Sequence, residues 1–234
     1  QKLLEAADVV IYAGSLVNPE LLAGLKANCR VYNSALMTLE EVLEVIREAE
    51  EQGLDTVRLH TGDPCLYGAI REQMDAMDRL GISYDLCPGV SSFCGAAAAL
   101  GMEYTLPGVS QSVVITRMAG RTPVPDRESV SCFAAHGATM VVFLSAGLLD
   151  GLQRELLDGG YKPSTPAAIV YKATWPEEKT VICCLDQLAD TAGREGISKT
   201  ALVIVGDSVS QAGYDRSLLY HPQFTTEFRK GEES

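Results

Sequence analysis

Two short loops, at residues 61–64 and 88–92, constrain the fold more than any other part of the sequence. Residues 58–68 read RLHTGDPCLYG, and residues 87–92 read CPGVSS. Each segment is a short apolar run that ends in a glycine–proline turn and passes into a helical pattern, which predicts a strand, a tight loop and a helix. Open α/β sheets bind ligands at the carboxyl ends of their strands. We therefore expect the two loops to share one ligand pocket.

Neither loop carries a signature of the commonest α/β sites. A G-x-G-x-x-G run, a Lys-Ser or Lys-Thr pair and a Ser-His-Asp set are all missing from them. Such signatures mark phosphate cradles and hydrolase elbows. The expected pocket therefore belongs to another class of ligand site.

Charge and length limit the partners that this chain can have. The 234 residues suffice for one large domain or two small ones. A net charge of -12 disfavours nonspecific binding to nucleic acid or to an anionic membrane, because both require a basic surface. No apolar stretch reaches the roughly 20 residues of a membrane helix. An anionic small ligand needs only a local cluster of arginine and lysine.

The cysteines and histidines show no metal or disulfide pattern. The seven cysteines include no C-x-x-C pair, and the three histidines lie far apart in the sequence. An odd number of cysteines without framework spacing indicates reduced thiols and a cytoplasmic protein. We therefore expect no metal site.

Strand and helix patterns alternate over the first hundred residues, which predicts a parallel sheet with helices on its faces. Thr38 and Glu41 form a capping-box pattern at the start of one helix, which stops at Gly53. We expect strands at 9–12, 31–33, 56–60 and 84–87, and helices at 19–26, 39–52, 69–80 and 92–100.

The pattern changes after a turn-rich passage at 101–110 that contains Pro107 and Gly108. We therefore predict an N-terminal α/β lobe at 1–108 and a C-terminal α/β lobe with a tail at 109–234. Strands follow one another more directly in the second lobe, which indicates a mixed sheet. We expect its strands at 112–117, 139–144, 167–172, 180–185 and 200–205, and its helices at 131–136, 146–157 and 187–192.

Several polar residues in these loops have both a structural and a functional interpretation. Asp63 could bind a ligand or close an Asx-turn on its own backbone, which is the commoner role of such a residue. Ser91 or Ser92 could cap a helix, or could hold a carboxylate together with free backbone amides. Lys172 and the only tryptophan, Trp175, could pack together or could form the wall of a pocket.

Two arginines four residues apart occupy a loop that is rich in glycine and proline. Arg117 and Arg121 are suited to binding carboxylates as a fork. The alternative is a surface ion pair with Asp126 or Glu128, which the spacing alone slightly favours.

Taken together, these segments resemble the tetrapyrrole methylase family over nearly the whole chain. The T-G-D-P and P-G-V-S loops are typical of the broad family. Two further segments, R-T-P-V-P at 121–125 and K-A-T-W-P at 172–176, are similar to those of members that methylate C11 of precorrin-4 or cobalt-precorrin-4 in cobalamin biosynthesis. The other matching segments are A-D-V-V-I-Y-A-G-S-L-V at 7–17, Y-G at 67–68 and T-R at 116–117.

The resemblance implies a homodimer of two-lobed subunits that bind S-adenosylmethionine in the cleft between the lobes and release S-adenosylhomocysteine. The substrate would be an anionic tetrapyrrole, and no general base is implied. The implied cofactor-binding residues are Thr61, Gly62, Asp63, Leu66, Ser91, Ser92, Leu144 and Ala173. The implied substrate-binding residues are Arg117, Arg121 and Lys172.

One departure from the family concerns the start of the chain. Family members begin with a strand and a G-x-G-P-G-D-P loop, which this sequence does not contain. We therefore expect an upstream segment and a gap in the first sheet beside residues 9–12.

Three other functions are possible for such a sequence. The first is a ribosomal-RNA methylase, which the negative net charge disfavours. The others are a relative that methylates another tetrapyrrole position and a dimeric module that binds a tetrapyrrole or adenosine compound without turnover.

Overall fold

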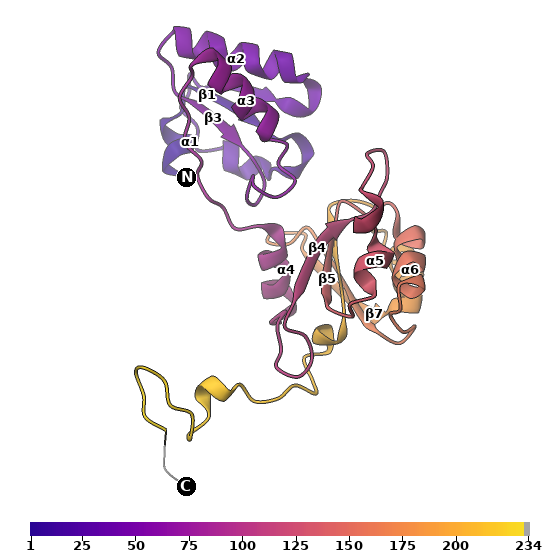
Figure 1. Ribbon diagram of the computed structural model, residues 1–234. Coiled ribbons are helices and arrows are strands. Elements are labelled where there is room, and N and C mark those ends of the chain that lie inside the picture. The colour runs from indigo at the N-terminus through magenta and orange to yellow at the C-terminus, as the bar shows by residue number, and fades with distance from the viewer. Residues whose placement is uncertain (232–234) are drawn as a thin grey trace. The chain divides into compact units, whose positions relative to one another are not determined.

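The computed structural model describes residues 1–231, apart from the side chain of Ser15. The chain divides into two compact units, Gln1–Ser92 and Phe93–Ser234, of which the last three residues are not described (Figure 1). Each unit is an α/β structure with its own sheet, as predicted. Whether the chain folds as two independent domains divided after residue 108 stays a prediction.

The first unit contains a parallel sheet of three strands in the order β2-β1-β3. Val9 lies opposite Arg30 on one side and opposite Thr56 on the other. All three strands therefore end at the same edge of the sheet, and the loop at 61–64 follows there. The strands are β1 (Val9–Tyr12), β2 (Arg30–Asn33) and β3 (Thr56–Leu59).

Two expectations about this sheet are wrong. β1 pairs with a strand on both sides, so no gap lies beside residues 9–12. Residues 84–87 form no strand, because within the described residues no strand pairs with them, and an apolar run alone does not supply the hydrogen-bond ladder of a sheet. In the part of the chain that the structure describes, β3 pairs only with β1, so its outer edge is open.

The helices of the first unit follow from local sequence signals. The capping box of α2 is present: the Glu41 backbone N–H donates to Thr38 Oγ1, and the Thr38 N–H donates to the Glu41 carboxylate. The predicted helix at 19–26 is only a single 3-10 turn. The helical elements are α1 (Lys2–Ala6), η1 (Gly14–Leu16), η2 (Pro19–Leu22), η3 (Ser34–Leu36), α2 (Leu39–Glu51) and α3 (Arg71–Leu80).

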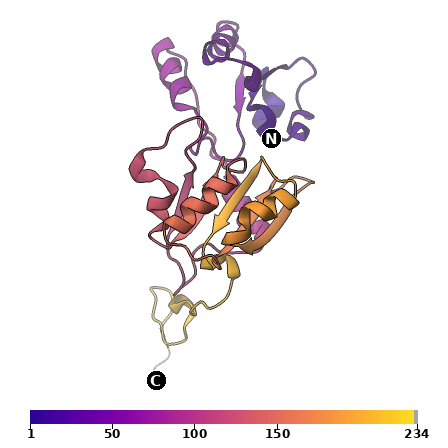
Figure 2. The same ribbon diagram turned by 90° about the vertical axis from the view of Figure 1, so that its right-hand side faces the viewer.

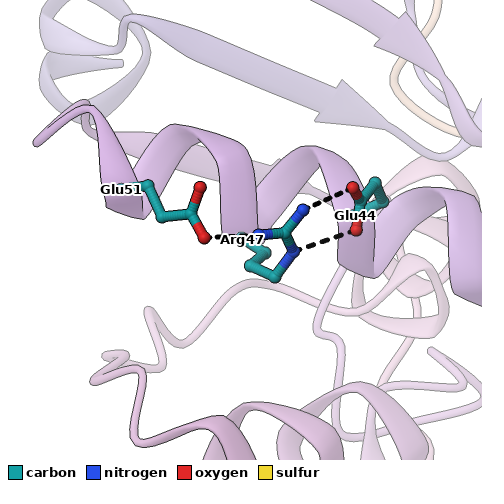
Figure 3. A network of polar contacts seen from close by, with 3 residues as sticks. All are labelled: Glu44, Arg47 and Glu51. Carbon is teal, nitrogen blue, oxygen red and sulfur yellow. Dashed lines mark hydrogen bonds and ion pairs between the residues drawn. The ribbon is translucent and has the colours of Figure 1, made fainter.

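Opposite faces of α2 meet the core and the solvent. Val42, Ile46 and Ala49 are buried and pack in one cluster with Val9 and Ile11 of β1. On the solvent side, Arg47 forms ion pairs with Glu44 and Glu51, one turn away in each direction (Figure 3). The apolar stripe therefore fixes α2 on the sheet, as its spacing predicts.

The second unit contains a mixed sheet, as predicted, and its five strands lie in the order β4-β5-β8-β6-β7. β4 and β5 are parallel, and the remaining pairs are antiparallel. The strands are β4 (Val113–Arg117), β5 (Thr139–Phe143), β6 (Pro166–Tyr171), β7 (Lys179–Cys184) and β8 (Ala201–Val205). The helical elements are α4 (Ser92–Leu100), η4 (Asp126–Glu128), α5 (Val130–Ala134), α6 (Leu149–Asp158), η5 (Leu185–Gln187), α7 (Leu188–Arg194), η6 (Asp207–Ser210) and η7 (Leu218–Tyr220).

Three helices cover one face of this sheet. Residues of α5, α6 and α7 pack in one buried cluster with alternate residues of the strands, and the helices lie in front of the sheet in Figure 2. Leu152, Leu156 and Leu188 are completely buried, and burying each such side chain stabilises the fold by about 1.5–3 kcal/mol. Val141 and Ile204, which point to the other face, are also fully buried. The sheet is therefore a rigid platform for the loops at its edges.

None of the helices in residues 1–231 is both long and apolar enough to span a membrane.

Candidate functional site

The two loops singled out from the sequence lie against each other. A Cβ atom added to Gly89 would lie 2.1 Å from the Gly62 carbonyl oxygen, and one added to Gly62 would lie 3.1 Å from Ser91 Cα. Gly62 also has a φ of 66°, in the left-handed region that favours glycine. The two loops are therefore in contact, which requires both glycines, and that they share one ligand pocket stays a prediction.

The Asp63 carboxylate joins these loops. Its Oδ1 atom accepts a hydrogen bond of 2.8 Å from the Cys65 N–H, and its Oδ2 atom accepts one of 2.8 Å from the Gly89 N–H. The first bond closes the turn that was considered from the sequence, and the second connects the loops. Hydrogen bonds from the Cys65 thiol and from the two N–H groups lower the pKa of Asp63. The carboxylate is therefore ionised at neutral pH and holds the two loops together.

The other predicted residues of this unit surround the contact between the loops. Thr61 Oγ1 donates a hydrogen bond of 2.6 Å to the Leu16 carbonyl, and the Leu66 N–H donates one of 3.3 Å to the Asp63 carbonyl. The hydroxyl groups of Ser91 and Ser92 have no hydrogen-bond partner within residues 1–231 and are half-buried. Two hydroxyl groups are thus available to a polar ligand here.

Two polar residues of β3 and its carboxyl end were missed in the sequence. The Arg58 guanidinium donates to the Ile11 carbonyl (2.9 Å), Ser34 Oγ (3.0 Å) and Gln73 Oε1 (3.2 Å), and it forms no ion pair with any described residue. His60 Nε2 is buried without a partner in the described chain, and burial, with a smaller effect of the Arg58 charge, lowers the pKa of His60 to about 4. Their only sequence signal is their alternate spacing before the loop, which places both on one face of the strand.

The predicted residues of the second unit gather at one edge of its sheet. β4 and β5 are parallel, and β6 runs in the same direction because both β5 and β6 are antiparallel to β8. Arg117, Leu144 and Lys172 stand at or just after the carboxyl ends of these three strands. This is the edge where α/β sheets bind ligands.

The backbone at this edge is strained. Leu144, Lys172 and Thr174 have φ values of 52°, 47° and 71°. Residues with a Cβ atom rarely adopt this region, and such strain of roughly 1–3 kcal/mol often marks ligand sites. The Leu144 side chain is 62% exposed although the strand before it is buried. These residues are therefore held in place by the surrounding structure rather than by their own preference.

The two arginines of this edge differ in their contacts. The Arg117 guanidinium donates to the carbonyl groups of Met118, Thr122 and Pro123, whereas Arg121 is exposed and has no hydrogen bond or ion pair within the described residues. The alternative of an ion pair with Asp126 or Glu128 is wrong for both arginines, because Arg117 contacts carbonyl oxygens and the partner of Glu128 is Arg127.

Lys172 and Trp175 pack together. The Lys172 Nζ atom lies 4.8 Å from the centre of the Trp175 ring and 3.4 Å from a Glu177 carboxylate oxygen. Ala173 lies between them in sequence, and its Cβ atom would be 3.6 Å from a Cβ atom added to Gly95 of α4. Lys172 therefore packs on Trp175 and already has a carboxylate partner, and that the two residues also form the wall of a pocket stays a prediction.

The candidate residues of both units can bind and orient ligands. Among the described residues, the first unit offers serine hydroxyls without a partner beside a backbone contact that admits no Cβ atom, and the second offers the guanidinium of Arg121, also without a partner. Within residues 1–231 no three His, Cys, Asp or Glu side chains are grouped so as to hold a metal ion. We assign no nucleophile or general base.

Comparison with known proteins shows the family of this chain. The family model described as Tetrapyrrole (Corrin/Porphyrin) Methylases matches residues 1–189. A cobalt-precorrin-4 C(11)-methyltransferase of Methanocaldococcus jannaschii is 48% identical over 233 residues, which cover 100% of this chain and 90% of that protein.

Two solved structures have the same fold. A cobalt precorrin-4 methyltransferase of cobalamin biosynthesis superimposes with a TM-score of 0.86 at 42% identity, covering 89% of this chain and 87% of the other. A uroporphyrin-III C-methyltransferase from Thermus thermophilus, complexed with S-adenosylhomocysteine, gives a TM-score of 0.74 at 28% identity and covers 90% of both chains.

Proposed function

Since the chain belongs to the tetrapyrrole (corrin/porphyrin) methylase family, we propose that it is a methyltransferase of cobalamin biosynthesis that acts on C11 of precorrin-4 or cobalt-precorrin-4. The observation that carries this proposal is the 48% identity to a cobalt-precorrin-4 C(11)-methyltransferase over the whole chain.

The loops of the first unit fit S-adenosylmethionine as the methyl donor. The contact between Gly62 and Gly89 admits no Cβ atom, so the two loops can pack closely enough to contact one ligand together. Ser91 and Ser92 would hold the amino-acid end of the cofactor through their free hydroxyl groups. The remaining cofactor contacts would come from Thr61, Gly62, Asp63 and Leu66 for the methionine and ribose portions, and from Leu144 and Ala173 for the adenine.

The carboxyl edge of the second sheet fits an anionic tetrapyrrole. Arg121 has no hydrogen-bond or ion-pair partner among residues 1–231, and it would bind a substrate carboxylate through a charge-assisted hydrogen bond worth about 1.5–3 kcal/mol. Lys172 would act at the same edge, although it must exchange its contact with Glu177 for one with the substrate. A second copy of the chain is the proposed partner, in a homodimer.

The role of these residues is alignment. The cofactor, when bound, supplies a sulfonium methyl group that is already activated for in-line displacement. The loops joined by Asp63 would hold the donor, and Arg121 would fix the ring so that C11 faces the methyl group. Alignment of this kind removes an entropic barrier of up to about 7–11 kcal/mol, so the proposal needs no catalytic nucleophile.

A turnover assay separates this enzyme from a binding module. The protein is incubated with S-adenosylmethionine in the presence and absence of precorrin-4 and of cobalt-precorrin-4, and S-adenosylhomocysteine is measured over time. We expect many turnovers that depend on one of the two tetrapyrroles. Binding of both ligands without release of S-adenosylhomocysteine would instead indicate a non-catalytic module.

A further inference from the structure

The side chain of Arg117 is directed at its own loop. Arg117 is the last residue of β4, and its guanidinium contacts three carbonyl groups of the following segment. Nη1 donates to the Met118 and Thr122 carbonyls at 3.2 Å each, and Nη2 donates to the Pro123 carbonyl at 2.7 Å. The guanidinium thereby connects the start of residues 118–123, here called the arginine loop, with its end.

The base of the arginine loop is fixed independently of Arg117. The Met118 N–H donates to Ser145 Oγ at 2.9 Å, and this fully buried hydroxyl donates to the Phe143 carbonyl at 2.7 Å. The Met118 side chain belongs to the buried core. The returning part of the loop has only one other backbone contact among the described residues, the Gly120 N–H to the Thr122 carbonyl at 3.2 Å. The closed shape of the loop therefore depends mainly on Arg117.

Arg121 lies within the loop that Arg117 closes. It is exposed, and no described residue is its hydrogen-bond or ion-pair partner. An exposed arginine on an open loop would lose much conformational entropy on binding, whereas a closed loop removes part of this cost in advance.

We propose that Arg117 is a positioning residue that folds the arginine loop and thereby presents Arg121 to a carboxylate of the tetrapyrrole. This inference rests on the proposed function for its substrate and assigns different roles to two arginines that the sequence presents as equivalent. Lysine cannot replace Arg117, because a single ammonium group lacks the planar fork that reaches carbonyl groups at both ends of the loop.

Limited digestion with trypsin tests the folding role without any substrate. Cleavage of the Arg121–Thr122 bond is followed by mass spectrometry in the wild type, in Arg117→Lys and in Arg117→Gln. Arg127→Gln is the matched control, because that side chain is 88% exposed and its only ion pair in the described chain is with Glu128. Proteolysis reports the open population of a segment. We expect both Arg117 variants to be cleaved at least about tenfold faster and the control to match the wild type.

Kinetics test the presentation role. KM for the tetrapyrrole and the affinity for S-adenosylmethionine are measured for Arg117→Gln, Arg121→Gln and the double variant. We expect each single variant to raise KM by a similar factor, the double variant to be no worse than either, and cofactor affinity to stay unchanged. Such non-additivity is the mark of two residues that act through one contact.

Each other outcome overturns a stated part of the inference. Unchanged tryptic cleavage together with additive effects on KM would show that Arg117 contacts the substrate itself. If Arg121→Gln keeps the wild-type KM while C11 is still methylated, the presentation role is wrong and the proposed function stands. If the wild type methylates no tetrapyrrole, the proposed function and the presentation role both fail, and the cleavage rates alone decide the folding role.

Discussion

At the scale of single residues, the candidate site depends on polar groups that bind the protein's own backbone. Asp63 accepts N–H groups from both loops, and Arg117 donates to carbonyls at both ends of its loop. The family resemblance implies that both residues contact ligands, whereas their local sequence alone favours an Asx-turn for Asp63 and an ion pair for Arg117. The sequence shows the motif to which each of these residues belongs. The hydrogen-bond partner of each side chain, however, depends on how its loop folds.

We expect Asp63→Asn to weaken S-adenosylmethionine binding far more than it weakens folding. An amide offers one acceptor oxygen where the carboxylate offers two, so the Cys65 and Gly89 N–H groups can no longer both be accepted, and the connection between the loops weakens. Isothermal calorimetry measures the affinity, and thermal unfolding measures the stability. Asp63→Ala should also lower the affinity for S-adenosylmethionine. A wild-type affinity in both variants would show that Asp63 does not organise the cofactor site.

The connection made by Asp63 should also depend on pH. Its pKa is lowered in the folded protein from 3.8, so its contribution to stability is fully present above this value and is lost as the pH falls through the folded pKa. We expect the difference in cofactor affinity between wild type and Asp63→Asn to shrink below about pH 4. A difference that does not shrink at any pH at which the protein stays folded would contradict the assigned ionic contact.

The burial of His60 predicts that the stability of the fold also depends on pH, in a higher pH range than for Asp63. Its pKa falls from 6.5 to about 4 on folding, so between these values the unfolded chain binds more protons than the folded one, and stability must fall as the pH is lowered. Urea unfolding at pH 7 and pH 5 should show a smaller loss of stability for His60→Gln than for the wild type. Equal losses would show that His60 is not buried in the neutral form.

At the scale of elements, local patterns predicted most of the fold. Strands such as β5 and β8 are apolar runs bounded by turn residues, and α2 has both its cap and its apolar stripe in the sequence. Residues 84–87, which read YDLC, were also expected to form a strand but form none. A strand exists only where a neighbour completes its hydrogen bonds, and this property lies outside the segment itself.

The cap of α2 should contribute more to stability than its surface ion pairs. The Glu44, Arg47 and Glu51 side chains are 40–62% exposed, and exposed pairs contribute about 0–1 kcal/mol. We expect Thr38→Ala to cost about 1 kcal/mol, measured by urea unfolding, and Thr38→Ser to restore most of it. If serine is as destabilising as alanine, the side-chain cap is not what stabilises the helix start.

At the scale of the whole molecule, each unit presents its candidate residues at the carboxyl edge of its own sheet. The loops at 61–64 and 88–92 belong to the first unit, and Arg117, Leu144 and Lys172 to the second. The family and its fold followed from the sequence because its motifs lie in these loops. The strain at Leu144 and Lys172 and the orphaned Nε2 atom of His60 could not be predicted, because they result from the packing around those residues.

The position of the transferred methyl group tests the central claim most directly. The protein is incubated with S-adenosylmethionine that carries a ¹³C-labelled methyl group and with precorrin-4 or cobalt-precorrin-4, and the product is analysed by NMR. We predict one labelled methyl group per ring, bonded to C11. A label at another ring carbon, or an unlabelled ring after binding of both compounds, would contradict the assignment.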